Sequence, residues 1–392
     1  MLQDNDRRRY KNYSGVGNTV NANHPIVSNF VMEVLRYGVM QMHVDGFRFD
    51  LASVLGRDED GNVLRNAPLL ERIAEDPILR DVKIIAEAWD AGGAYQVGSF
   101  SERRWIEWNG RFRDDVRRFW LGEPAMTPVF AGRICGSADL YGASGKGPGS
   151  SLNFITAHDG LTLNDLVSYN QKHNEENGEF GRDGSGPNYS ENCGVEGPSD
   201  NPEIEALRKR LIKNLLLTLF ISRGIPMLLG GDEFRRTQKD NNNAYCQDNN
   251  VSWFDWSFVE SHREIHRFAR GMIAFRRTHS VLRKETFYSD AEVTWVGSHG
   301  GVPEWSNPAQ SAFACLILGY SEPDLFLMFN AGGEAVTFPL PGARATAIWH
   351  LAADTSRSAP DDFHEDGQEP APQDQSRFRL GRRSSAILLR RT

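Results

Sequence analysis

The sequence has little of what marks disulfide-rich, zinc-binding or membrane-spanning proteins. Its 392 residues include four cysteines, and these lie far apart without a Cys-x-x-Cys spacing. Neither a disulfide framework nor a zinc knuckle is therefore indicated, and a reducing compartment is expected. No apolar stretch reaches transmembrane length, since the apolar run at 211–223 is interrupted by Lys213 and Asn214.

An excess of basic residues is also missing. The formal net charge is -8, which argues against nucleic acid or an anionic membrane as a partner, because both require basic patches. The charge is compatible with a neutral polymer as substrate. With 40% hydrophobic and 24% charged residues, the chain is long enough to bury a large core and to form more than one domain.

What the sequence does contain is a series of acidic residues at the ends of apolar runs of strand length. Asp50 closes the run 43–50, Glu87 lies within 83–90, and Asp159 closes 152–159. A (β/α)8 barrel builds its active site in this way, from groups at the C-terminal ends of successive parallel strands. Acids gathered at one barrel mouth suggest glycoside chemistry.

At these motifs the chain resembles the α-amylase superfamily of glycoside hydrolases, and within it the isoamylase and glycogen-debranching group. The segment Gly46-Phe47-Arg48-Phe49-Asp50 is similar to the family's nucleophile strand, and Ala86-Glu87-Ala88-Trp89 to the segment of its general acid/base. His158-Asp159 resembles the pair that carries the transition-state-stabilising aspartate. Three motifs in the family's order make the resemblance specific.

The residue types suit a retaining glycosidase, in which one carboxylate attacks the anomeric carbon and a second, about 5 to 5.5 Å away, donates and accepts the proton. Arg48 lies one pleat from Asp50 and favours its charged form, as a nucleophile requires. Glu87 is flanked by Ala86, Ala88 and Trp89, which supply little solvation and suit a proton donor. By resemblance, Asp159 supports the oxocarbenium-like state, and His158 donates a hydrogen bond beside it.

Each motif also has an ordinary structural interpretation. Arg48 and Asp50 are spaced as a same-face ion pair, Glu87 taken alone is a solvated acid, and His-Asp-Gly is common turn chemistry. The coincidence of all three in order favours the catalytic interpretation. A competing acid pair, Asp232 and Glu233, follows another apolar run and is interpreted as loop-positioning or as part of the substrate rim.

No metal and no cofactor are expected. His262 and His266 stand one helical turn apart, as two metal ligands on one helix face would. A third ligand is not evident, and the glutamate between them is not in the His-Glu-x-x-His order. The surrounding pattern is that of an amphipathic surface helix, which is the interpretation we adopt.

Strand and helix alternate over the first two thirds of the chain. Five barrel strands are predicted: those of Asp50, Glu87 and Asp159, the segment 105–109, and the run before Asp232. Helices are predicted at 25–42, 67–79, 110–120, 203–221 and 262–277. The first of them carries an apolar stripe, expected to face the core, of Phe30, Val31, Val34, Leu35 and Val39.

The predicted fold is α/β, a partial TIM (β/α)8 barrel lacking its first strands, followed by a C-terminal antiparallel β-sandwich. The predicted domains are 1–280, the catalytic barrel from about its fourth strand, and 281–392, where short strands are separated by Gly, Pro, Asn and Ser. The family's first three strands and its N-terminal sandwich have no counterpart here, so an N-terminally truncated fragment is expected.

Two polar loops are expected to shape the substrate site. Segment 172–202 is a long Gly-, Asn- and Glu-rich insertion, expected to be a lid or disordered. Segment 237–249 is rich in amides. Arg48, His158, Trp89, Asn243 and Tyr245 are the predicted substrate-binding residues, since amides and aromatic rings suit sugar hydroxyls and ring faces.

The function that this resemblance implies is hydrolysis of α-1,6-glucosidic branch linkages in glycogen or starch by retention. The expected partner is a branched α-glucan such as glycogen, amylopectin or limit dextrin. Alternatives are an α-1,4-acting amylase or glucosyltransferase with the same acids, and a non-catalytic glucan-binding fragment. The expected compartment is the cytoplasm, or the plastid in a photosynthetic eukaryote.

Overall fold

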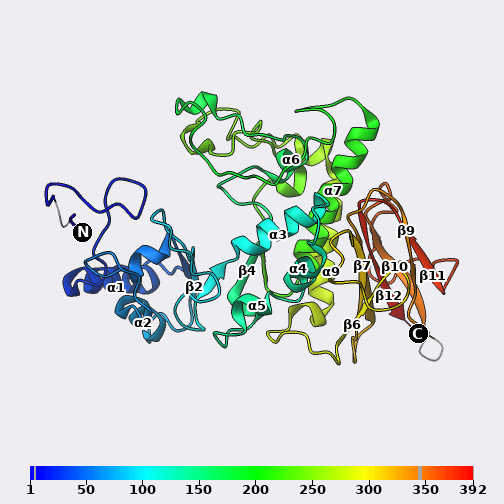
Figure 1. Cartoon of the computed structure of the whole chain (residues 1–392), viewed down its shortest axis with the longest axis horizontal. Coiled ribbons are helices and arrows are strands. Elements are labelled where there is room, and N and C mark those ends of the chain that lie inside the picture. The colour runs from blue at the N-terminus through cyan, green and yellow to red at the C-terminus, as the bar shows by residue number, and fades with distance from the viewer. Residues whose placement is uncertain (4–5, 343–346, 392) are drawn as a thin grey trace. The chain divides into compact units, whose positions relative to one another are not determined.

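The structure, a computed structural model, describes residues 1–3, 6–342 and 347–391 (Figure 1). The chain divides into two compact units, and each is described by itself. The first contains Met1–Gly110 and Gly136–Asn153, and the second contains Arg111–Cys135 and Phe154–Thr392. These units are defined by compactness alone, so the domains 1–280 and 281–392 stay a prediction.

The first unit is built on parallel strands. Strand β1 (Gly46–Phe49) pairs with β2 (Lys83–Ala86), β2 pairs with β3 (Ile106–Trp108), and β3 pairs with β4 (Ser151–Phe154), each in parallel. The connecting elements are helical: α1 (Pro25–Met40), η1 (Ala52–Gly56), α2 (Pro68–Glu75), α5 (Ala138–Tyr141) and η2 (Pro148–Ser150). Helices α1 and α2 both begin at a proline, whose fixed φ suits the first helical turn.

The core of the first unit confirms only part of the stripe predicted for α1. Of the predicted stripe, Leu35 is buried, and Val31 and Val39 pack against the same apolar cluster, which also contains Met32 and residues of α2. Phe30, however, is 68% exposed and Val34 is 51% exposed, so the prediction that they face the core was wrong. Helix α1 carries apolar residues on more than one side, and within this unit the side with Met32 and Leu35 is the covered one.

The second unit contains the longer helices and one further short strand, β5 (Ile225–Met227). Its α-helices are α3 (Gly110–Trp120), α4 (Thr127–Ile134), α6 (Leu163–Leu166), α7 (Pro202–Ile221), α8 (Phe258–Ser261) and α9 (Arg263–Thr278). Its 3-10 helices are η3 (Glu175–Asn177), η4 (Asp232–Phe234), η5 (Ala244–Cys246) and η6 (Ser280–Arg283). All five strands predicted for the parallel part of the fold are therefore present.

The C-terminal part of this unit is an antiparallel β-sandwich, as predicted, and its strands run from yellow through orange to red in Figure 1. Five strands follow the order β10-β12-β8-β7-β6, and two more pair as β11-β9. Their bounds are β6 (Val293–Val296), β7 (Ala312–Ile317), β8 (Asp324–Asn330), β9 (Val336–Pro339), β10 (Ile348–Asp354), β11 (Arg377–Leu380) and β12 (Ser384–Arg391).

One apolar core joins this sandwich to the helices of the second unit. The rings of Phe119 in α3 and Phe130 in α4 are stacked, with centroids 3.8 Å apart. Phe313 of β7 and Phe329 of β8 meet Phe130 at 6.0 and 5.3 Å. Helix α7 is buried on every side from residue 211 to residue 221. Among the described residues, no helix combines the length and the apolar character needed to cross a membrane.

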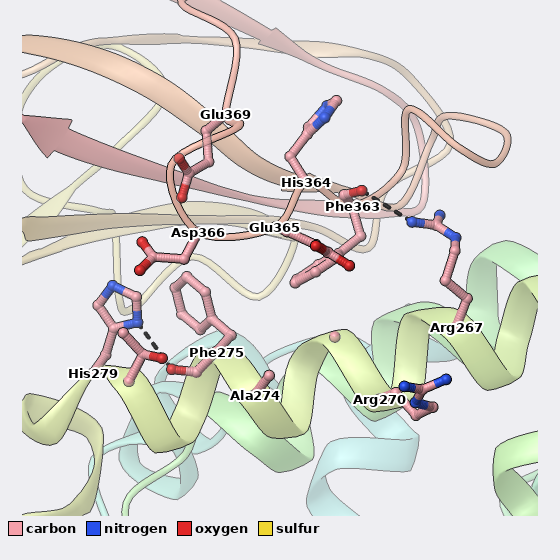
Figure 2. A pocket seen from close by; sticks show the side chains of 12 residues that line it. Arg267, Arg270, Ala274, Phe275, His279, Phe363, His364, Glu365, Asp366 and Glu369 are labelled. Carbon is pink, nitrogen blue, oxygen red and sulfur yellow. Dashed lines mark hydrogen bonds between the residues drawn. The ribbon is translucent and has the colours of Figure 1, made fainter.

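A cavity of about 390 Å³ lies between α9 and the segment 363–369 (Figure 2). Arg267 of α9 donates to the carbonyl of Phe363 across it, while the imidazole of His364 points away from the helix. Two acids of its lining, Asp366 and Glu369, are already paired with Arg391. These contacts make the cavity part of the junction between the helix and the sandwich.

Candidate active site

The register of β1 and β2 brings the two principal candidate acids together. Phe49 pairs with Ala86, so the next residues of the two strands, Asp50 and Glu87, come opposite one another at the C-terminal ends. The pairing continues past the strands, because the amide of Glu87 donates to the carbonyl of Phe49 at 3.1 Å. In-register residues of neighbouring strands point to the same face of the sheet, and Arg48, two residues before Asp50, shares that face.

Arg48 bridges these two carboxylates. Its Nη1 lies 2.7 Å from Asp50 Oδ1, and its Nη2 bonds to Glu87 Oε1. The Asp50 side chain is 71% exposed, whereas that of Glu87 is 4% exposed, so one acid is open to solvent and the other is enclosed. The two acids are separated by no more than one guanidinium and its hydrogen bonds.

From the sequence, Arg48 was expected to interact with Asp50 alone, and its hydrogen bond to Glu87 was not predicted. That bond joins residues 39 positions apart. Trp108 at the end of β3 was missed as well: the guanidinium of Arg48 lies over its indole ring. No local pattern signals either contact, because both depend on the pairing of β1 with β2 and of β2 with β3.

Glu87 is also held by the backbone that follows Asp50. Its Oε2 accepts a hydrogen bond of 3.0 Å from the amide of Leu51. Leu51 has φ 42° and ψ 49°, a left-handed conformation that costs free energy in a residue with a β-carbon. This strained turn aims the amide at Glu87, and the sequence pattern contained no signal for it.

Trp89 lies two residues beyond Glu87 and stacks on Tyr95. The ring centroids are 6.2 Å apart and the planes differ by 11°. Trp89 is half-buried and Tyr95 is 49% exposed, so the pair presents aromatic surface in the same unit as the two acids. A flat aromatic surface of this kind suits the face of a sugar ring, as predicted for Trp89.

Asp159 and His158 belong to the second unit, in the turn that follows β4. His158 Nε2 lies 3.5 Å from Asp159 Oδ2, and the two side chains are 55% and 63% exposed. The loop that carries them is anchored on both sides, since Thr156 and the amide of Leu163 donate to the buried carboxyl of Asp232. Burial raises the pKa of Asp232 to about 7. Its position fits the loop-positioning interpretation given to it.

The segments 172–202 and 237–249 are bound to one another by a network of amide groups. Asn242 accepts and donates hydrogen bonds with Asn174, and its backbone carbonyl accepts from Gly160 beside Asp159. The amide nitrogen of Asn243 donates to Asp183 at 2.9 Å. Tyr245 is 81% exposed. Segment 172–202 is therefore held against its neighbour and is not a free loop.

The chain is similar in sequence to known proteins. Residues 294–384 match the family model described as Isoamylase 1-3, C-terminal. The glycogen operon protein GlgX homolog of Mycobacterium tuberculosis is 45% identical, over 91% of this chain and 52% of that protein. Isoamylase 3, chloroplastic, of Oryza sativa is 44% identical, over 99% of this chain and 49% of that protein.

Solved structures give the same fold. A pullulanase type I from Bacillus subtilis, complexed with maltose, superposes with a TM-score of 0.72 at 20% identity, covering 99% of this chain and 49% of that one. A pullulanase of Anoxybacillus complexed with maltotetraose gives a TM-score of 0.70. The chain spans about half the length of the curated relatives it matches. Over nearly all of its own length it is therefore similar to part of the proteins named isoamylase or GlgX homolog.

Proposed function

We propose that this chain carries the nucleophile and the acid/base of an enzyme that hydrolyses α-1,6-glucosidic branch linkages in glycogen- or starch-type glucans. The observation that supports this most is the single guanidinium of Arg48 on both Asp50 and Glu87 at the ends of paired parallel strands. Relatives at 42–45% identity are named isoamylases and glycogen operon proteins, which favours the α-1,6 bond over the α-1,4 bond.

In this proposal Asp50 attacks the anomeric carbon and forms a glycosyl-enzyme intermediate. Its exposure of 71% suits a group that must reach a substrate. Glu87 gives its proton to the leaving oxygen and then takes one from the attacking water, which yields net retention. An enclosed carboxyl such as Glu87 suits an acid/base, because solvent competes little for its proton.

Arg48 compensates the negative charge of Asp50 before attack and orients both acids. The glucosyl residue entering between them takes over part of the hydrogen bonding that Arg48 now supplies to Glu87. We assign the stacked rings of Trp89 and Tyr95 to the sugar on the leaving-group side, because they follow Glu87 in the chain. For Asp159 and His158 we keep the role that the family resemblance implies, support of the oxocarbenium-like state.

The test compares this chain with matched variants on phosphorylase limit dextrin and on linear amylose. Glu87→Gln is expected to lower turnover by about 10²- to 10⁴-fold and Asp50→Ala by at least as much. Asp45→Ala, at the opposite end of β1, and Glu75→Gln, exposed at the end of α2, serve as controls and should leave turnover unchanged.

Each outcome is informative. Release of short linear chains from the limit dextrin, with amylose spared, supports debranching. Cleavage of amylose replaces the proposal with an α-1,4-acting enzyme. Binding of limit dextrin by the wild-type chain without new reducing ends overturns the hydrolase proposal in favour of a glucan-binding protein. Near-normal turnover in Asp50→Ala or Glu87→Gln contradicts the roles given to those residues.

A further inference from the structure

A cavity of about 450 Å³ opens in the second unit, on residues that play no part in the proposed reaction. Its walls come from the end of α6, the segment 197–199, the first turns of α7, the segment after η4, and α8 with the residue that follows it. A volume of this size is in the range of small-molecule sites. The chemistry of its lining indicates which kind of molecule it takes.

A buried guanidinium with one free nitrogen forms part of this lining. The Arg235 side chain is 5% exposed; its Nε donates to Asn164 at 3.0 Å and its Nη1 to Glu205 at 2.9 Å. Among the residues that the structure describes, Nη2 has no hydrogen-bond partner. This nitrogen is not among the fully buried atoms without a partner, so it remains accessible in the lining of the cavity and can donate to a ligand there.

Positive charge exceeds negative charge around the cavity. Arg208, 1% exposed, donates to the other oxygen of Glu205 at 3.1 Å, so one carboxylate serves two guanidinium groups. Lys239 is exposed and adds a third cation to the lining. The neighbouring acid Asp165 is buried beneath Thr237, and burial raises its pKa. The excess is local, since the whole chain carries a formal charge of -8.

The pKa of His262 is also affected by these positive charges. It is half-buried at the start of α9, with its ring against Phe258. Burial is the main cause that lowers its pKa to about 4, and the charges of Arg235 and Lys209 lower it further, against the opposing charges of Glu205 and Glu264. The imidazole is therefore neutral at neutral pH and provides one donor and one acceptor.

The backbone conformation at Arg235 and Lys239 supports a functional role for these two cationic residues. Arg235 has φ 62° and Lys239 has φ 53°, in the left-handed region where glycine is free of strain and other residues are not. Two long cationic side chains thus stand at positions where glycine would fit the backbone better. Both residues line the same cavity, so two residues with a strained backbone lie where positive charge is concentrated.

We propose that this cavity binds the phosphate monoester of a hexose, with the phosphate on Arg235 and Lys239. With Nε and Nη1 already bonded, Nη2 of Arg235 can donate one hydrogen bond to a phosphate oxygen, and charge-assisted hydrogen bonds of this type are the stronger ones. The hydroxyls of Ser168 and Tyr169 and the neutral His262 line the same cavity and suit the hydroxyls of the sugar. The phosphate is carried either by a free hexose phosphate or by an esterified glucan.

Calorimetric titration of the whole chain with glucose 6-phosphate tests the proposal, with inorganic phosphate and maltose as comparison ligands. We expect a dissociation constant of about 1 mM or lower for the hexose phosphate, weaker binding of phosphate, and no displacement of the hexose phosphate by maltose. Binding should weaken as salt is added, since the attraction is ionic.

Three variants locate the site. Arg235→Gly removes the guanidinium and relieves the left-handed backbone, and it should weaken binding at least about tenfold. Lys239→Gln should weaken it by about threefold or more. Arg263→Gln removes an equal charge from a side chain that is 80% exposed outside the cavity, and it should leave binding unchanged. Urea unfolding of each variant verifies that it is folded.

Further binding experiments distinguish the two sources of the phosphate. They also define the results that would overturn the proposal. Retention of phosphate-bearing amylopectin by the chain, abolished by prior phosphatase treatment of the amylopectin, indicates an esterified glucan; binding of glucose 6-phosphate without such retention indicates a free hexose phosphate. Absence of binding at 10 times the expected dissociation constant, roughly 10 mM, overturns the proposal. So does equal binding by a folded Arg235→Gly variant.

Discussion

The guanidinium of Arg48 lies over the indole ring of Trp108, with its Cζ 4.7 Å from the ring centroid. Trp108 is 8% exposed and ends β3, two strands away from Asp50 in the sheet. A cation held over an aromatic face is stabilised by about 0.5 to 2 kcal/mol. The indole therefore fixes a side chain that contacts both Asp50 and Glu87, and we regard Trp108 as a positioning residue.

We predict that Trp108→Ala lowers kcat by about 3- to 30-fold, the factor that corresponds to losing this contact, with a smaller change in KM. Trp108→Phe keeps an aromatic face under Arg48 and should restore most of the lost turnover. Steady-state kinetics on limit dextrin measures both. A purely structural role for Trp108 would instead lower the free energy of unfolding without this split, and unchanged kcat in a folded Trp108→Ala would refute the positioning role.

A second prediction concerns the pH dependence of stability. Burial raises the pKa of Asp232 to about 7, from an ordinary value near 4, against the lowering effect of its bonds to Thr156 and Leu163. Between these two pH values the folded chain binds a proton that the unfolded chain has lost. The free energy of unfolding should therefore fall as pH rises from 4 to 7, by at most about 4 kcal/mol from this group.

Asp232→Asn removes this proton and keeps groups that can bond to Thr156 and Leu163. Urea unfolding at a series of pH values should show that the wild-type chain loses more stability between pH 4 and 7 than the variant does. Asp200→Asn, at an exposed position, controls for the loss of one carboxylate. Parallel pH curves for the wild-type chain and Asp232→Asn would show that Asp232 is already ionised in the folded state at low pH. Glu233 and Arg236 act on the same carboxyl and are unchanged in both proteins.

The parts of the fold that could be predicted from the sequence are those that depend on neighbouring residues. Acids at the ends of apolar runs predicted that Asp50 and Glu87 follow β1 and β2, and periodicity predicted α3 and α7 nearly to the residue. The short strands of the C-terminal sandwich were predicted in the same way, because turn residues delimit a short strand locally.

What could not be predicted depends on pairing between distant segments. The contact of Arg48 with Glu87 requires the β1–β2 register, and the position of Trp108 requires the β2–β3 pair. The stripe on α1 failed at Phe30 because an apolar residue in a sequence does not say which side of a helix is covered. The free nitrogen of Arg235 results from three segments meeting around one side chain, which no local pattern encodes.

The third prediction uses two glycines inside helices of the second unit. A β-carbon at Gly271 in α9 would lie 2.4 Å from the ring of Phe363, whereas one at Gly132 in α4 would meet no heavy atom within 4 Å among the described residues. Phe363 is 6% exposed and packs against Phe268, so its ring cannot move away freely. Figure 2 shows Phe363 above the helix that carries Gly271.

Gly271→Ala should therefore destabilise the chain by about 1 to 3 kcal/mol, since the added methyl overpacks the junction between α9 and the sandwich. Gly132→Ala makes the same chemical change in a helix with open space, so it should stabilise by about 0.5 to 1 kcal/mol through the better helix propensity of alanine. Urea unfolding of the three proteins measures both differences. Equal stability of the two variants would mean that Phe363 does not press on α9, and the cavity beside it would then have a different shape from the one described.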